Sequence, residues 1–281
     1  MKKRTILLVV NNQTPDQYIQ QIAQNCREFD NHLSCFLMSA GASTPPMIYG
    51  APLYGTIDIA DNWTQLLDEA IQKQKERVEE IEAALSKTGS SADVQSLLCS
   101  PADTSDHIAR RARVCDLAFL APNLRETPQF FNEAAHGVLF KTPIGLMVNG
   151  YPTSKVGRAL NAWDSSGAAA ASVHRALPYL KRADEVNITC FDPITTQDQA
   201  GADPGTDLAA WLSHHGCSVN LMQLPSGGKE IGVCIQDRAK EIGSDLVVLG
   251  AYGHSRLVQA VLGGTTRTML EQTELPVLMA H

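Results

Sequence analysis

SDLVVLG at residues 244–250 and CDLAFLA at residues 115–121 are two versions of one segment. Each follows a stretch rich in alanine and in arginine or lysine, and each precedes a short apolar run that starts at a proline, Pro276 and Pro143 respectively. Self-similarity of this kind is the signature of a repeated structural unit. The sequence therefore predicts two copies of one module, joined near residues 150–154.

Short apolar runs in both copies predict β-strands. The predicted strands are Thr5–Val10, Leu33–Met38, Val94–Leu98, Asp116–Leu120, Pro143–Val148, Ala159–Trp163, Val186–Phe191, Val219–Gln223, Asp245–Gly250 and Val277–Ala280. Helical spacing of apolar residues predicts helices between them. The main ones are a long helix over 65–87, followed by His107–Arg113, Phe130–Val138, Gly167–Leu180, Thr206–His214, Lys229–Ile242 and Thr265–Thr273.

Apolar strands that alternate with amphipathic helices favour an α/β fold with parallel sheets covered on both faces. We expect two doubly wound modules, each a five-stranded parallel sheet, over residues 1–150 and 151–281. Such sheets bind ligands outside the carboxyl ends of their strands. This rule directs attention to Asp164 and to the loop after Leu249.

The composition excludes several classes of protein. Of 281 residues, 44% are hydrophobic and 19% are charged, so the chain has enough apolar surface for a large core and is not intrinsically disordered. A net charge of −7 disfavours general binding to nucleic acid or anionic membrane, and we expect neither as a partner. No apolar run reaches the roughly 18–20 residues that a spanning helix needs.

The seven cysteines are scattered and form no C-x-x-C pair. This pattern favours reduced thiols and a cytoplasmic location over a disulfide framework. His214, His215 and Cys217 match no zinc-site spacing, so we predict no metal site there.

The segment after the strand 245–250 carries the candidate chemistry. Glycines stand at Gly250, Gly253 and Gly263, a spacing of two and then nine intervening residues, and Gly264, Thr265 and Thr266 follow at a predicted helix start. Glycines let a backbone approach a ligand closely, and amides at a helix start bind anions. His254 and Arg256 can add positive charge, so phosphate is the expected ligand.

Two familiar nucleotide motifs are absent from the sequence. The chain has no G-x-x-x-x-G-K-[ST] motif, and no G-x-G-x-x-G follows its first strand. The glycine spacing after the fourth strand instead resembles the ATP-binding motif of the universal stress protein family. AWDSS at 162–166 and LPVLM at 275–279 resemble the first and last strands of that family, so the whole chain is similar to a tandem universal stress protein.

The resemblance implies a role for each matching residue. Asp164 would contact the ribose hydroxyls, and Ala162 would border the adenine. Gly250 and Gly253 would shape the loop under the phosphates. Gly263, Gly264 and Thr265 would offer amides to them. The family usually has Ser or Thr where this chain has Gly264, which removes a hydroxyl contact. The residue-level alternative is that Asp164 only caps a helix.

The first copy departs further from the family motif. After Leu120 it has none of the motif glycines, and Pro122 and Pro128 remove amide donors. Asn11 stands where the aspartate is expected, so a charge-assisted bond to ribose is lost. We expect this module to hold no nucleotide and to serve in packing and partner presentation, with the loop at 45–50 as a candidate contact surface.

The resemblance implies a stress-response protein that binds ATP, ADP or AMP, with or without Mg²⁺, as a signal or structural ligand. Slow ATP hydrolysis or autophosphorylation is compatible with it, but no catalytic residue is assigned. One alternative is a nucleotide-free interaction module with vestigial sites, and another is an enzyme such as an adenylyl transferase. The resemblance also implies that the two modules form a pseudo-dimer within the chain, with Pro143–Val148 beside Pro276–Ala280, and that chains pair as homodimers. The protein partner is not identified.

Overall fold

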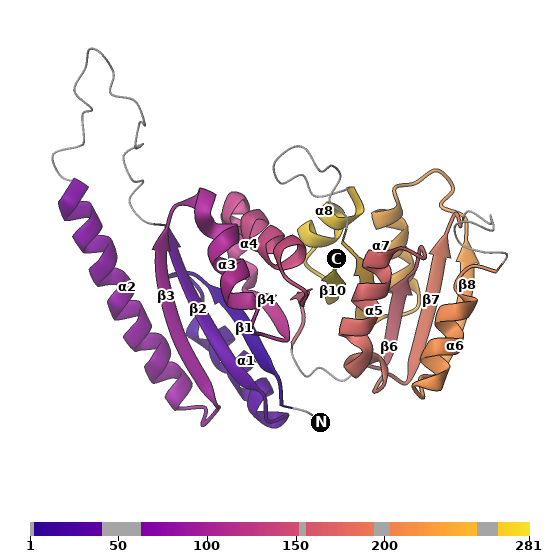
Figure 1. Ribbon diagram of the computed structural model, residues 1–281, viewed down its shortest axis with the longest axis horizontal. Helices are drawn as coiled ribbons and strands as arrows, with labels where there is room; N and C mark the ends of the chain where they lie inside the picture. The colour runs from indigo at the N-terminus through magenta and orange to yellow at the C-terminus, as the bar shows by residue number, and fades with distance from the viewer. Residues whose placement is uncertain (1–2, 41–62, 152–155, 194–202, 252–263) are drawn as a thin grey trace, which may run out of the picture.

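The computed structural model describes residues 3–40, 63–151, 156–193, 203–251 and 264–281 (Figure 1). All of the strands in these ranges form one sheet of ten strands in the order β3-β2-β1-β4-β5-β10-β9-β6-β7-β8. Neighbouring strands are parallel except for β5 and β10, which are antiparallel. The expected pair of parallel five-stranded modules is confirmed, and the two sheets are joined edge to edge.

The elements follow the predicted alternation closely. The strands are β1 Thr5–Val10, β2 His32–Ala40, β3 Ala92–Cys99, β4 Leu117–Leu120, β5 Gly145–Val148, β6 Arg158–Ala162, β7 Glu185–Phe191, β8 Val219–Leu224, β9 Leu246–Gly250 and β10 Val277–Ala280. The helices are α1 Asp16–Glu28, α2 Trp63–Ser86, α3 Thr104–Ala112, α4 Pro128–Lys141, α5 Gly167–Leu180, α6 Thr206–His214, α7 Ile231–Glu241 and α8 Gly264–Glu271, with short 3-10 turns η1 Pro101–Asp103 and η2 Pro122–Glu126.

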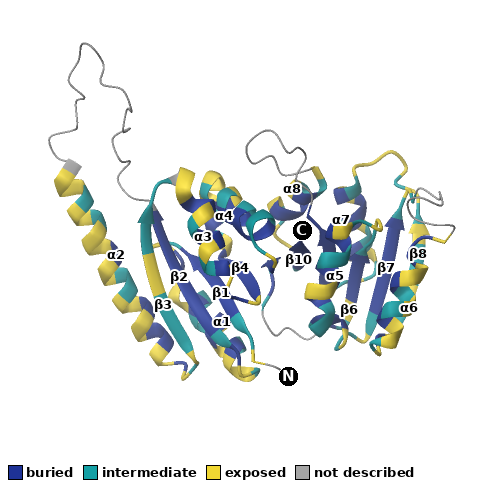
Figure 2. Cartoon of the chain, viewed as in Figure 1, coloured by how far each residue is buried: buried dark blue, intermediate teal, exposed yellow. Residues whose placement is uncertain are grey.

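Strands β5 and β10 join the two modules. Val277 pairs with Val148 and Met279 with Leu146, as expected from the resemblance. Both strands are buried along their whole length, so the junction lies inside a continuous apolar core (Figure 2). Burying both last strands removes two exposed sheet edges, which would otherwise invite pairing with other chains.

Arg125 in η2 makes a second bridge between the modules. Its Nε and one terminal nitrogen donate to the Leu270 carbonyl, each at 3.1 Å, and the same terminal nitrogen donates to the Gln272 carbonyl at 3.3 Å. Leu270 lies in the last turn of α8, where carbonyls lack partners inside the helix and favour a cation. The guanidinium also lies over the Phe131 ring at 4.7 Å.

Helix α5 is fixed to the ends of β9 and β10 by one buried hydroxyl. Ser172 Oγ donates to the Leu249 carbonyl at 2.6 Å and accepts from the Ala280 amide at 3.0 Å. The helix start approaches the end of β9 so closely that a Cβ on Gly250 would lie 2.6 Å from the Ala169 nitrogen. Glycine at position 250 is therefore required by packing alone.

The apolar residues of the predicted long helix, α2, are buried only toward its end. Ile81 and Leu85 are buried, whereas Ile71 is 49% exposed. The physical reason is length, because a helix of 24 residues is about 36 Å long and the eight residues of β3 extend only about 26 Å. The first turns of α2 extend past the end of β3 (Figure 1).

Replacing Arg125 with methionine tests the second bridge. The change keeps a long side chain but leaves the carbonyls of α8 without their charged donor, so we expect a loss of about 1.5–3 kcal/mol in the free energy of unfolding. Urea denaturation followed by circular dichroism measures it. Arg110→Met, at an exposed position on α3, is the matched control. Equal stability of the two variants would contradict the role of the bridge.

Gly250→Ala tests the close packing of α5 on β9. The added methyl meets backbone atoms, which cannot move aside cheaply, and overpacking of this kind costs about 1–3 kcal/mol. Thermal unfolding should therefore show a clear fall in Tm. Gly167→Ala is the control, because a Cβ there meets nothing within 4 Å. An unchanged Tm for Gly250→Ala would refute the packing requirement.

Candidate functional site

The second module has a cavity of about 220 Å³ at the carboxyl ends of β6, β7 and β9. Four predicted site residues contribute to its lining: Ala162, Asp164, Gly250 and Thr265. The structure thus brings together residues from the end of β6, the end of β9 and the start of α8. Gly253, His254 and Gly263 lie outside the described residues.

Asp164 stands at the start of the β6–α5 connection and lines the cavity. Its Oδ1 accepts a hydrogen bond from the Ser166 amide at 3.1 Å. The residue that caps α5 is Ser166, whose Oγ accepts from the Ala169 amide at 3.1 Å. The simple helix-cap interpretation of Asp164 is therefore not supported, because a different side chain fills that role.

The start of α8 forms another part of the site. Gly264 and Thr265 begin this helix, and Thr265 lines the cavity. Thr266 is fully buried and is not among the described residues that line the cavity. A Cβ on Gly264 would meet only the Glu230 Oε1, at 3.6 Å, so the position has room for a side chain. The first amides of α8 lack partners inside the helix and favour an anion.

Apolar side chains from two other elements complete the walls. They are Phe191 at the end of β7 and Ile231 and Ile235 of α7. Thr189 of β7 also lines the cavity, and its fully buried hydroxyl has no hydrogen-bond partner among the described residues. Sequence reasoning missed these residues because their apolar character predicts core rather than site. The register pairs Thr189 with Ala162, and only the assembled sheet shows this neighbour.

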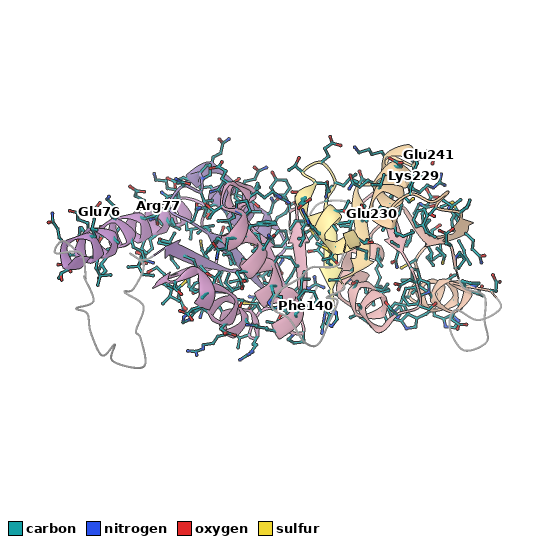
Figure 3. The ribbon with its side chains drawn as sticks, turned by 90° about the horizontal axis from the view of Figure 1, so that it is seen from above. Glu76, Arg77, Phe140, Lys229, Glu230 and Glu241 are labelled. Atoms are coloured by element: carbon teal, nitrogen blue, oxygen red, sulfur yellow. The ribbon has the colours of Figure 1, made fainter. Side chains whose placement is uncertain are left out.

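Glu230 is a charged residue beside the site that sequence reasoning also missed. It stands immediately before α7, and its Oε1 accepts a hydrogen bond from Thr268 Oγ1 of α8 at 2.7 Å. Figure 3, seen from above, shows Glu230 next to α8. A carboxylate near a helix start stabilises that helix, but it also repels a second anion that binds there.

The first module has a cavity at the corresponding place, with a volume of about 310 Å³. Ile6 pairs with Leu117 in this module as Ala159 pairs with Leu246 in the second. Counting five residues onward from Ile6 and from Ala159 gives Asn11 and Asp164, so Asn11 takes the place of Asp164 in the fold. Asn11 lines this cavity, and the connection from β4 to α4, which contains η2, is shorter than the connection from β9 to α8.

The other sequence candidates do not form a site. Among the described residues, no group of three or more metal-ligating side chains comes together. His215 instead packs edge-on against the Trp211 ring, with centroids 4.3 Å apart. All seven cysteines are free, and burial raises the pKa of Cys26 and of Cys35 to about 12, so these two thiols are poor nucleophiles. No described helix is long and apolar enough to cross a membrane.

Comparisons with known proteins agree with this architecture. Residues 227–281 match the model of the Universal stress protein family. A proposed universal stress protein from Pseudomonas aeruginosa UCBPP-PA14 aligns over 99% of this chain and 93% of its own, with a TM-score of 0.56 and 15% identity. A protein of unknown function from Pseudomonas aeruginosa PAO1 aligns over 99% and 92%, with a TM-score of 0.51 and 15% identity.

No curated protein matches the sequence. At 15% identity the two structural similarities establish the fold, and the family match covers the part of the chain that runs from before α7 to the last residue. The chain is thus a tandem protein with the universal stress protein fold, and its second module carries the match to the Universal stress protein family.

Proposed function

We propose that the protein acts in a stress response and binds an adenine nucleotide, ATP, ADP or AMP, in its second module as a signal or structural ligand. The observation that carries the proposal is the cavity itself, which is lined both by Asp164 and by Thr265 at the start of α8. The family match and the names of similar structures support the stress-response part. We further propose a cytoplasmic location and a dimer of chains.

The described side chains suit the parts of an adenine nucleotide. The Asp164 carboxylate can accept hydrogen bonds from ribose hydroxyls, and such charge-assisted bonds are the stronger kind. Phe191, Ile231 and Ile235 offer apolar surface to a base. The first amides of α8 lack partners inside the helix and can donate to a phosphate.

The proposal includes binding with at most slow hydrolysis or autophosphorylation. Among the described residues that line the cavity there is no lysine, arginine or histidine, and Asp164 is the one ionisable carboxyl. Phosphoryl transfer depends on cationic groups that stabilise the transferred phosphoryl and on a residue that positions the nucleophile. Asp164, assigned here to the ribose, does not supply them.

The carboxylate of Glu230 favours the competing interpretation, a nucleotide-free interaction module. It lies beside the helix start where the phosphates would bind. Mg²⁺ bound to the phosphates would supply the neutralising charge, and we therefore propose that ATP binds as its magnesium complex. The two interpretations differ in whether the purified protein binds nucleotide at all.

Isothermal titration with magnesium-ATP tests the proposed function. The protein is first unfolded and refolded to remove nucleotide carried through purification. We expect binding with one ATP per chain, weakened roughly tenfold in Asp164→Asn, because a neutral amide replaces a charged acceptor. Asp184→Asn is the control, since Asp184 is exposed and precedes β7 at the opposite end of the sheet. No heat at millimolar ATP would refute the proposal and favour the interaction module.

Glu230→Gln tests the charge beside the phosphate end. Removing the carboxylate should strengthen ATP binding roughly threefold at low salt, and the gain should shrink as salt screens the charge. Adenosine, which has no phosphate, should bind both proteins equally. The hydrogen bond from Thr268 is retained because the glutamine amide oxygen also accepts. An equal gain for adenosine and ATP would show that charge is not the cause.

A further inference from the structure

We propose that the first module holds a second binding site, for an uncharged nucleobase-like ring compound rather than a nucleotide. The site is the cavity of about 310 Å³ at the carboxyl ends of the first module's strands, a volume within the range of small-molecule sites. It corresponds in position to the candidate nucleotide cavity of the second module. Its chemistry is different, and the difference identifies the class of ligand.

The described residues that line this cavity are all uncharged. The polar ones that bear on recognition are Asn11, Gln13, Ser39, Thr104, Thr127 and Gln129. Met38 and Phe130 add apolar surface that can pack on the faces of a ring. Side chains of this kind can form hydrogen bonds with the edges of an uncharged ligand, but they cannot neutralise a charged ligand.

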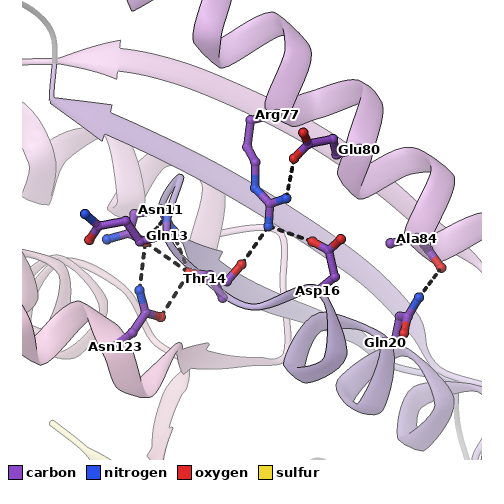
Figure 4. A network of polar contacts seen from close by, with 9 residues as sticks. All are labelled: Asn11, Gln13, Thr14, Asp16, Gln20, Arg77, Glu80, Ala84 and Asn123. Atoms are coloured by element: carbon purple, nitrogen blue, oxygen red, sulfur yellow. Dashed lines mark hydrogen bonds and ion pairs between the residues drawn. The ribbon is translucent and has the colours of Figure 1, made fainter.

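Asn11 is held in one orientation by its neighbours (Figure 4). Its Oδ1 accepts from the Gln13 amide at 3.0 Å and from Asn123 Nδ2 at 2.8 Å, and Thr14 Oγ1 lies 3.2 Å away. Asn123 is oriented in turn, because its Oδ1 accepts from Thr14 Oγ1 at 3.0 Å. The network uses the acceptor of Asn11 and leaves its Nδ2 group to donate. Where Asp164 offers an acceptor, Asn11 offers a donor.

Arg77 of α2 stabilises the same turn. Its guanidinium donates to the Thr14 carbonyl at 2.6 Å and pairs with Asp16 at 2.7 Å. The turn that presents Asn11 is therefore tied both to η2, through Asn123, and to α2. A preorganised donor of this kind loses little entropy when a ligand binds.

Several backbone groups of the turn η2, between β4 and α4, cannot donate to a phosphate. Pro122 has no amide hydrogen, and the Leu124 and Thr127 amides donate to the Ala121 and Leu124 carbonyls at 3.0 Å. The cationic side chain of this turn, Arg125, instead donates to the Leu270 carbonyl near the end of α8. The first amides of α4 could donate to an anion, but no cationic side chain stands among the described lining residues, so a charged phosphate would pay a desolvation cost and the cavity favours a neutral ligand.

The amide side chains specify the ligand further. Asn and Gln can pair bidentately with an edge that carries one donor and one acceptor, as adenine does. Gln13 and Gln129 line the cavity and offer this combination, and Asn11 adds a donor. Together with the apolar surface of Phe130, they fit a flat heterocycle with amide-like edges.

Titration with the free bases adenine and hypoxanthine, in the presence of saturating magnesium-ATP, tests the proposal. We expect one base to bind per chain with a Kd below 1 mM. Gln129→Trp should fill the mouth of the cavity and abolish binding, whereas Asn132→Trp, exposed on the same helix, should not. Asn11→Asp keeps the acceptor of the network, replaces the donor by a charged acceptor, and should weaken binding at least tenfold.

Asp164→Asn separates this site from the nucleotide site, because it should leave base binding unchanged. Absence of binding for both bases, or binding that survives Gln129→Trp, would overturn the proposal. A second equivalent of ATP that is lost in Gln129→Trp would also overturn it, since the cavity would then accept phosphate. If ATP fails to bind while a base still binds in the absence of ATP, the proposed function fails and this inference stands.

Discussion

Backbone hydrogen bonds between β5 and β10 turn two half-sheets into one sheet, and the rest of the structure depends on this pairing. Each module by itself would expose the edge of a short, apolar strand. Because the two strands run antiparallel, the modules are related by an approximate twofold rotation. The same rotation places two equivalent cavities in one molecule, one in each module.

The two cavities show how one scaffold supports different chemistry. Both lie where strands end and helices begin, a position set by the fold. The connection from β4 to α4 in the first module differs from the connection from β9 to α8 in the second. In the second module the chain runs from β9 over a long segment to α8, and in the first it turns at once through η2, whose amides bond within the turn. Asp164 lines the second cavity, and Asn11 takes its place in the first. The described lining residues of the first cavity are therefore all uncharged.

The sequence predicted most of the fold because its signals are local. Apolar runs and helical spacing located the strands to within about two residues, and β1 and β10 agree with their predicted bounds. The pairing of β5 with β10 came from family resemblance, since periodicity does not show which edges meet. The exposure of Ile71 was missed because the pattern along a helix does not reveal where the sheet beneath it ends.

The candidate site was only partly predictable, for a related reason. Asp164 and Thr265 could be found because they belong to a spaced motif, whereas Glu230 reaches the site through a hydrogen bond to Thr268, 38 positions away. Gly250 fits the motif, yet the close approach of α5 already requires a glycine there. A glycine motif therefore combines packing and binding constraints, and only the structure separates the two.

The first module has a structural role at the candidate site of the second module. Arg125 donates to the Leu270 carbonyl in the last turn of α8, and Thr265 at the start of that helix lines the candidate site. A helix of eight residues is about 12 Å long and moves as a unit. Asn149, just after β5, adds a hydrogen bond to the Gln272 carbonyl at 2.9 Å. The position of α8 is thus set from both modules, so the geometry of the second site depends on the presence of the first.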